Sequence, residues 1–315
     1  MNQIPNRPLF TQLIRDTSSF RPPPGSTYIY GRFEERTSLV ETWSTQASGV
    51  RFIELEELAT PIVRPVTGGY PEFSLRQQTK VEGFLKSIGT VDLYLDITGL
   101  SFHVWAPLIK VAVNLSFNLK VVYIEPADYS YSLNPMRGEI FDLSERTLGI
   151  APVPLFASLS DPEDQTVCFI PLLGFEGARL AYMIEQVDPP GSKIIPIIGV
   201  PGFRVEYPFN TYHGNEPALS NTRAWQKVRF ATANCPFSAF YALTDVIETY
   251  ESAYIKVAPI GTRPHALGAL LKCLASHRPI EIVYDHPKRH RSSSSGSMNC
   301  LVYHVADFLN SNPMR

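Results

Sequence analysis

The segment 258–271 (APIGTRPHALGALL) has the residue types of an anion-binding turn. A predicted strand ends at Gly261, and Thr262, Arg263 and His265 then open a predicted helix. Backbone N–H groups at a helix N-terminus, a hydroxyl and a guanidinium can together bind a phosphate. The alternative is a core helix that starts at a proline and carries a solvated arginine. Because GxxxxGK[ST] and GxGxxG are both missing, neither a Walker NTPase loop nor ordinary dinucleotide binding is predicted.

Two other segments share a pattern of phenylalanine, glutamate and arginine. GRFEER contains Glu34 and Arg36, and LGFEGAR, half a chain later, contains Glu176 and Arg179. Each segment follows a predicted strand and leads into a predicted helix. One interpretation is that two related halves turn these carboxylates toward a shared crevice. The other is that the match is coincidental and both glutamates only begin helices, where the helix dipole favours a negative charge.

A third set of polar residues closes a strand in the middle of the chain. Asp96 and Thr98 end the apolar segment VDLYLDITG. An aspartate at the end of such a strand can contact a ribose or a metal. Either side chain could equally cap the helix that follows.

These segments supply the candidate site residues. If the protein is an enzyme, the candidate acid–base or nucleophilic carboxylates are Glu34, Asp96 and Glu176. The candidate ligand- and phosphate-binding residues are Arg36, Thr98, Arg179, Gly261, Thr262, Arg263 and His265. No metal site is predicted, because no two of the 4 cysteines lie at zinc-binding spacing and HExxH is absent. No cofactor is identified, and a nucleotide is the candidate ligand.

Three polar segments leave two interpretations open. Residues 134–146 and 202–215 mix aromatic, arginine and acidic side chains, which suit either stacking on a nucleobase beside a phosphate or a protein interface. The run YDHPKRHR at 284–291 could contact nucleic acid, or it is a solvated charge cluster.

The elements that must position these residues alternate between strand and helix. Apolar, β-branched segments such as 27–33, 91–99, 165–175 and 254–261 are each followed by a segment with helical periodicity. This alternation predicts an α/β fold with a doubly wound, mainly parallel, Rossmann-like sheet and helices on both faces. Ligands of such folds bind beyond the carboxyl ends of the strands. The polar residues named in the preceding paragraphs fall at these strand ends.

The predicted domain organisation has three parts. Residues 1–26 form a lead-in segment, 27–287 form the α/β domain, and 288–315 form a polar linker followed by an edge strand at 300–308. The spacing of the two Phe-Glu segments suggests related halves at 27–162 and 163–287. Segments 60–73, 127–162 and 203–219 are predicted loops, with one short helix at 140–148 and a helix N-cap at Ser74.

Composition excludes several classes of protein. Lys+Arg is 28 and Asp+Glu is 30, so the net charge of −2 does not fit a strongly basic nucleic-acid coat. No apolar run reaches the length of a membrane span, so no membrane contact is predicted. The first residues do not resemble a signal peptide, and the cysteines are set in apolar sequence. A reduced, cytoplasmic location is therefore predicted.

The order of four motifs resembles a known group of proteins. FEER, DITG, GFE and GTRPHALG, followed by VYDHP, resemble the pattern of uncharacterised Rossmann-like proteins from bacterial anti-phage defence islands. The resemblance covers residues 27–287. It implies a bacterial, cytoplasmic protein that acts with neighbouring gene products, and it carries no established activity.

Three functions follow from these observations. The first is a nucleotide-binding module that acts as sensor, effector or subunit of a defence complex with a protein partner. The second is an enzyme of the N-glycosidase or deoxyribosyltransferase type that uses the carboxylates named above. The third is a non-catalytic subunit that only contacts other proteins. Direct contact with nucleic acid stays open.

Overall fold

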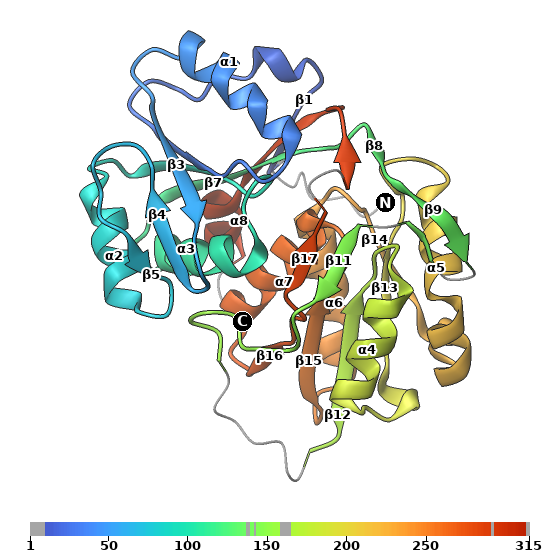
Figure 1. Cartoon of the computed structure of the whole chain (residues 1–315). Coiled ribbons are helices and arrows are strands. Elements are labelled where there is room, and N and C mark those ends of the chain that lie inside the picture. Colours follow the sequence, from blue (N-terminus) through green and yellow to red (C-terminus); the bar gives the residue numbers. More distant parts are fainter. Residues whose placement is uncertain (1–9, 137–138, 142, 158–164, 291–292, 313–315) are drawn as a thin grey trace, which may run out of the picture.

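Two β-sheets lie side by side in this protein, and helices cover the faces of both (Figure 1). The computed structural model describes residues 10–136, 139–141, 143–157, 165–290 and 293–312. Residues before 125 supply most of the larger sheet, whereas the smaller sheet lies wholly within 167–282. In the described ranges, no helix has the length and apolar character needed to cross a lipid bilayer.

The larger sheet has eight strands, and only its centre is parallel. Across the sheet they are β1 (Thr11–Ile14), β19 (Cys300–His304), β7 (Asn118–Ile124), β6 (Asp92–Asp96), β2 (Thr27–Tyr30), β3 (Arg51–Glu57), β4 (Ile62–Pro65) and β5 (Phe73–Ser74). The central strands β7, β6, β2 and β3 are parallel. Antiparallel strands extend the sheet at both edges.

The smaller sheet has five strands, all parallel. Across the sheet they are β14 (Arg229–Ala231), β13 (Ile197–Gly199), β12 (Val167–Leu172), β15 (Tyr254–Pro259) and β16 (Ile280–Ile282). The chain runs outward from β12 to β13 and β14, then returns to β15 on the other side of β12. The strand order therefore reverses between β12 and β15.

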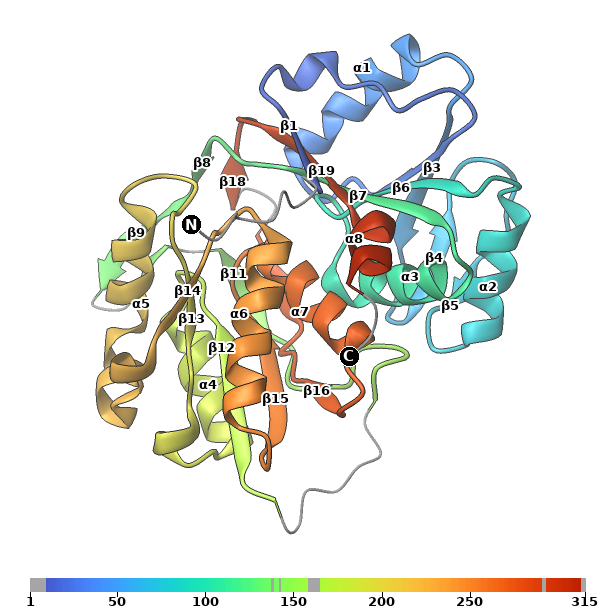
Figure 2. The ribbon, with the colours of Figure 1, turned by 180° about the vertical axis from the view of Figure 1, so that it is seen from behind.

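Helices cover the two faces of the smaller sheet in pairs. On one face, α4 (Gly177–Val187) and α5 (Tyr207–Thr222) pack on strand residues such as Phe169 and Ile198. On the other face, α6 (Pro236–Thr249) and α7 (Arg263–Ala275) pack on residues such as Ile170 and Val257. Both α6 and α7 are in front in the reversed view (Figure 2).

One hydrophobic core joins the two sheets. It holds Leu267 and Leu270 of α7 together with Ile109 of α3 (Phe102–Asn114) and Leu85 of α2 (Gln78–Ser87). Helix α8 (Val305–Ser311) adds Phe308 to the same core. The opposite face of the larger sheet is covered by α1 (Leu39–Gln46). Because α7 packs against both sheets, it fixes where its own N-terminus lies.

The predicted single, doubly wound and mainly parallel Rossmann-like sheet is wrong. The strands divide between two main sheets and three two-stranded ones, and the largest sheet is mixed. Periodicity shows which face of a strand is buried, but it does not show which strands pair. The predicted lead-in contributes β1, and the predicted edge strand β19 lies inside the sheet between β1 and β7. The predicted loop 60–73 supplies β4 and part of β5.

The predicted loop 127–162 contains short strands, and its predicted helix at 140–148 is absent from the described residues. The strands are β8 (Asp128–Tyr129), β9 (Tyr131–Met136), β10 (Glu139–Phe141) and β11 (Ser144–Thr147). Their partners include β17 (Pro287–Arg289) and β18 (Ser294–Ser295) from the predicted linker. These pairings join distant segments, so local sequence does not reveal them.

Two helix predictions also need correction. The predicted loop 203–219 lies largely in α5, which tolerates Pro208 because a proline in the first turn lacks only an N–H that the helix does not use. Ser74 belongs to β5, and the N-cap of α2 is Gln77.

Glycine pairs bring strand ends together in both sheets. A Cβ at Gly31, after β2, would lie 2.5 Å from the carbonyl oxygen of Gly99, after β6, and a Cβ at Gly99 would overlap the Gly31 carbonyl. In the smaller sheet, a Cβ at Gly174 would lie 2.9 Å from the Ile260 oxygen, and one at Gly261 would overlap the Leu173 carbonyl. Both contacts occur where the strand order reverses.

We expect Gly99→Ala to destabilise the protein by about 1–3 kcal/mol, because the added methyl group must displace backbone. Gly83→Ala is the matched control, since open space surrounds Gly83 in α2 and alanine favours a helix by about 0.5–1 kcal/mol. Urea unfolding measures both variants. Equal stability of the Gly99 variant and the wild type would contradict the close approach.

Candidate functional site

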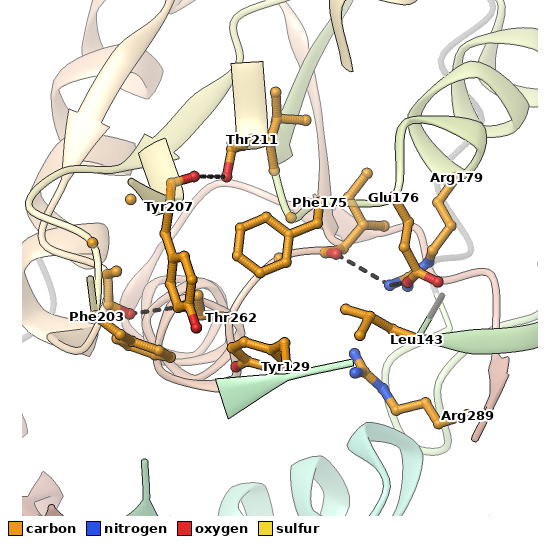
Figure 3. A pocket seen from close by; sticks show the side chains of 17 residues that line it. Tyr129, Leu143, Phe175, Glu176, Arg179, Phe203, Tyr207, Thr211, Thr262 and Arg289 are labelled. Atoms are coloured by element: carbon orange, nitrogen blue, oxygen red, sulfur yellow. Dashed lines mark hydrogen bonds and ion pairs between the residues drawn. The ribbon is translucent and has the colours of Figure 1, made fainter. Parts of the chain in front are cut away.

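A pocket lies at the carboxyl ends of β12, β13 and β15, where the strand order of the smaller sheet reverses (Figure 3). We call it the β12–β15 pocket. Parallel sheets bind ligands at this place because loops diverge there and helix N-termini face it. The pocket is lined by Tyr129, Leu143, Leu173, Gly174, Phe175, Glu176, Arg179, Gly199, Gly202, Phe203, Tyr207, Thr211, Ala233, Ile260, Gly261, Thr262 and Arg289.

Aromatic rings form one side of the β12–β15 pocket. Phe175 stacks on Phe141, with ring centroids 4.2 Å apart and an interplanar angle of 18°. Tyr207 meets the Phe175 ring edge-on at 5.1 Å, and Tyr129 does so at 5.5 Å. Burial raises the pKa of Tyr129 and Tyr207, so both phenols stay neutral at physiological pH. The rings hold one another in place and present a neutral surface to a flat ligand.

Two arginines reach the pocket, and they differ in their partners. Arg179 is buried and donates two hydrogen bonds to the Asp285 carboxylate, at 2.7 and 2.6 Å, and a third to the Ile260 carbonyl at 3.1 Å. The Arg289 guanidinium points into the pocket (Figure 3). Within the described ranges, its side chain has no hydrogen bond or ion pair. Arg289 is thus the cation available to a ligand.

Two helices begin at the pocket. Glu176 is the N-cap residue of α4, and its carboxylate accepts a hydrogen bond from Ser144 Oγ at 3.0 Å and lies 3.7 Å from Arg179 Nη1. Thr262 is the N-cap residue of α7; its hydroxyl accepts from the His265 N–H at 3.2 Å and donates to the Ala233 carbonyl at 2.8 Å. The positive ends of both helix dipoles favour an anion here.

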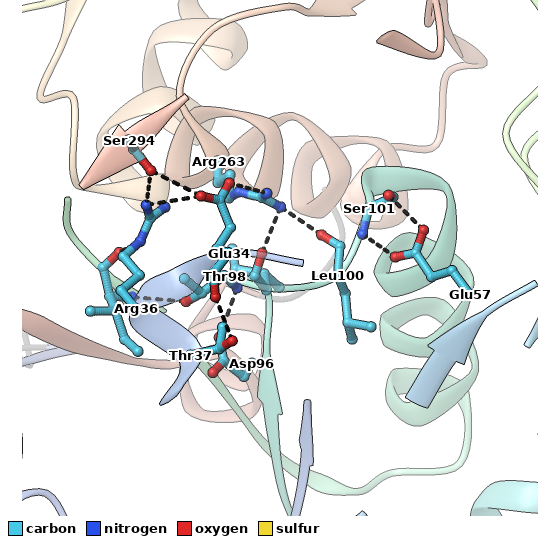
Figure 4. A network of polar contacts seen from close by, with 12 residues as sticks. Glu34, Arg36, Thr37, Glu57, Asp96, Thr98, Leu100, Ser101, Arg263 and Ser294 are labelled. Carbon is cyan, nitrogen blue, oxygen red and sulfur yellow. Dashed lines mark hydrogen bonds and ion pairs between the residues drawn. The ribbon is translucent and has the colours of Figure 1, made fainter. Parts of the chain in front are cut away.

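A buried ionic network ties the two sheets together (Figure 4). The Glu34 carboxylate accepts hydrogen bonds from Arg36 at 3.1 Å, Arg263 at 3.1 Å and Ser294 Oγ at 2.9 Å. Burial alone would raise the pKa of Glu34, but the charges of Arg36, Arg263 and Arg289 outweigh it and lower that pKa. Glu34 is therefore an ionised structural anion that does not line the β12–β15 pocket.

The two arginines of this network each make further hydrogen bonds. Arg36 also donates to the Ile124 carbonyl at 2.8 Å and hydrogen-bonds Ser294. Arg263 also donates to the Ile97 and Leu100 carbonyls, at 2.8 and 2.6 Å. Arg263 thus binds the carboxyl end of the larger sheet instead of a ligand phosphate.

Three predicted site residues lie inside the core. Asp96 accepts from the Tyr28 hydroxyl at 2.9 Å and from the Thr98 N–H at 2.7 Å, and burial raises its pKa. Thr98 Oγ1 accepts from the Ile124 N–H at 2.9 Å. His265 Nε2 lies 3.1 Å from the Thr232 carbonyl, and burial lowers the His265 pKa to about 4, so its imidazole is neutral. Neither Asp96 nor Thr98 caps α3, whose N-cap is Ser101.

The structure divides the predicted site residues into two groups. Those that line the β12–β15 pocket are Glu176, Arg179, Gly261 and Thr262. Those engaged elsewhere, in the network or the core, are Glu34, Arg36, Asp96, Thr98, Arg263 and His265. Tyr129, Phe175 and Arg289 also line the pocket, although no sequence motif predicts them as ligand contacts. Arg289 lies in the basic run 284–291, and Phe175 lies in the repeated Phe-Glu motif.

The repeated Phe-Glu segments do occupy corresponding positions. Glu34 is the N-cap of η2 (Glu35–Ser38), just as Glu176 is the N-cap of α4. Each following arginine donates to a carbonyl at or just beyond the end of a parallel strand, Arg36 to Ile124 and Arg179 to Ile260. The two glutamates do not line one crevice, however, because Glu34 is buried under its own ionic partners.

The chain matches no known family model, and no curated protein or solved structure is significantly similar to it. The resemblance to defence-island proteins therefore stays a prediction.

We expect Glu34→Gln to destabilise the protein by about 3–5 kcal/mol at pH 7, because it leaves two buried arginines without their anion. The lowered pKa of Glu34 sets the pH dependence: its contribution is present above its ordinary pKa of 4.5 and is lost as the pH falls through the lower folded-state value. The gap between wild type and variant should therefore close in acid.

Urea unfolding from pH 7 to pH 3 measures this effect. Glu56→Gln is the control, because Glu56 pairs with Arg64 at the surface and its loss should barely move the midpoint. A Glu34 variant as stable as the Glu56 variant would show that the network does not hold the sheets together.

Proposed function

We propose that this protein binds a nucleotide in the β12–β15 pocket. The base lies among the aromatic side chains, and a phosphate lies between Arg289 and the N-terminus of α7. The observation that carries the proposal is the Arg289 guanidinium, which points into an aromatic pocket and has no partner among the described residues.

The chemistry of the lining supports a nucleotide over other small molecules. Aromatic faces stack on any nucleobase, and each such contact is worth about 1–3 kcal/mol. A guanidinium suits the oxygens of a phosphate, and the positive end of the α7 dipole favours the same charge.

The cellular setting is part of the proposal. Four free cysteines suit a reducing cytoplasm. The resemblance implies a bacterial defence complex in which the protein acts as sensor, effector or subunit. Exposed apolar side chains on and beside α5 offer a surface for the protein partner: Val205, Phe209, Trp225 and Phe230 are 86%, 71%, 55% and 55% exposed.

A nucleotide- or nucleoside-processing enzyme is the second candidate, and one observation favours it. Glu176 lines the pocket beside the aromatic rings, as the nucleophile or acid–base group of an N-glycosidase or deoxyribosyltransferase would. Glu34 and Asp96 cannot share this role in the observed arrangement, because internal hydrogen bonds occupy both.

We expect Arg289→Ala to weaken nucleotide binding at least tenfold, because the phosphate loses its cation. Isothermal titration calorimetry with the four nucleoside 5′-diphosphates measures this, after mass spectrometry of any small molecule released by denaturation. Arg229→Ala is the matched control, since Arg229 is exposed at the amino end of β14, away from the pocket. Binding that is absent in the wild type, or equal in both variants, would refute the proposal and favour a subunit that only contacts proteins.

Product analysis by liquid chromatography separates binding from turnover. If the enzymatic candidate is right, wild-type protein releases free base from nucleosides or nucleotides, and Glu176→Gln abolishes the release without shifting the melting temperature by more than a few degrees. Release that persists in this variant would remove Glu176 from the chemistry.

A further inference from the structure

A second cavity lies between the two sheets, and we call it the inter-sheet cleft. It is lined from the larger sheet's side by residues that include Glu57, Phe102 and His103, and from the other side by residues that include Gly261, Tyr284 and Arg289. It leaves about 380 Å³ for the centres of water-sized molecules. That volume is within the range of small-molecule sites.

The inter-sheet cleft and the β12–β15 pocket meet at two residues. Gly261 and Arg289 line both cavities. Gly261 immediately precedes the N-cap residue of α7, and the Leu173 carbonyl packs against its Cα. Arg289 is the cation without a partner among the described residues. A molecule that lies across this junction therefore passes a guanidinium and a helix N-terminus midway along its length.

The walls of the cleft suit a neutral, ring-bearing group. Tyr284 contacts Phe102 at 4.8 Å and His286 at 5.0 Å between ring centroids, and His103 lies 5.6 Å from His286. Burial, reinforced by the neighbouring His286, lowers the pKa of His103 to about 4, so this imidazole is neutral at pH 7. The rings thus continue the aromatic lining beyond the junction.

Apart from Arg289, the arginine and lysine side chains that line the cleft are ion-paired, and its carboxylate is hydrogen-bonded. Arg263 pairs with Glu34, and Lys288 pairs with Glu145 at 2.5 Å. The Glu57 carboxylate accepts hydrogen bonds from the Ser101 N–H at 2.6 Å and from Ser101 Oγ at 2.7 Å. The anionic part of a ligand is therefore better placed at the junction than in the cleft, while the carboxylate and imidazoles of the cleft can bind hydroxyl groups.

We propose that the ligand is a nucleoside diphosphate whose β-phosphate carries a second ring-bearing group, such as another nucleoside or a sugar. The base occupies the β12–β15 pocket, the two phosphates cross Gly261 beside Arg289, and the second group occupies the inter-sheet cleft. This inference rests on the proposed nucleotide binding and specifies the class of nucleotide.

Isothermal titration calorimetry on the full chain tests the inference. Each of the four nucleoside 5′-diphosphates is compared with its symmetric dinucleoside 5′,5′-diphosphate and with its glucose ester. At least one extended ligand should bind ten times more tightly than the diphosphate of the same base, and the two extended ligands show whether the second group is a nucleoside or a sugar. Extended ligands that bind no better than diphosphates would overturn the inference and leave nucleotide binding intact. No binding by any probe would overturn both.

A cleft variant locates the second group. His286→Asn removes a ring of the cleft, and asparagine tolerates the left-handed backbone at this position, where φ is 46°. It should lower the affinity for the extended ligand at least fivefold, toward that of the diphosphate. His213→Asn, an exposed position on α5, is the matched control and should change neither affinity. Full affinity of the His286 variant, with an unchanged melting temperature, would place the second group outside the cleft.

Discussion

The contact between Glu34 and Arg263 is the interaction on which the arrangement of the two sheets depends. It joins the carboxyl end of the larger sheet to the N-terminus of α7, a helix of the smaller sheet. Glu34 is buried and the Arg263 side chain is 13% exposed, and a contact of this kind is favourable only when every partner is present. Arg36, Ser294 and two backbone carbonyls complete it. The N-terminus of α7, and with it Gly261 and Thr262, is thereby held where the two cavities meet.

The two sheets have similar strand ends at the point where the strand order reverses, but different side chains occupy the space beyond them. In each, a glycine pair lets two parallel strands approach where the strand order reverses, and a Phe-Glu turn starts the next helix. In the larger sheet, Arg36 and Arg263 fill the space beyond these strands and neutralise Glu34. In the smaller sheet, the corresponding Arg179 pairs with Asp285, which does not line the pocket. The space beyond the strands therefore stays open and is lined by aromatic rings. The strand ends of the larger sheet are thus closed by an ionic network, whereas those of the smaller sheet border a pocket.

Charge pairing also explains where a ligand can act. Most cations near the two cavities already have an anionic partner, and a ligand phosphate would have to break those contacts to use them. Arg289 has no hydrogen bond or ion pair with a described residue, although its charge also acts on Glu34, and it lines both cavities. A ligand phosphate is therefore expected at the Arg289 guanidinium and the N-terminus of α7. The aromatic side chains on either side supply contact area for the rest of the ligand.

The sequence by itself determined the local features: most strands and helices, the helix start at Thr262, the repeated Phe-Glu turns and the polar residues at strand ends. These depend on periodicity, capping and turn chemistry, which act over a few residues. Only the tertiary structure decided how strands divide between two sheets, because hydrophobic alternation does not specify partners. It also decided which charged residues are free. Glu34 and Glu176 share a preceding phenylalanine and a following arginine. Glu34 nevertheless pairs with Arg263, 229 positions away, whereas Glu176 lines a pocket.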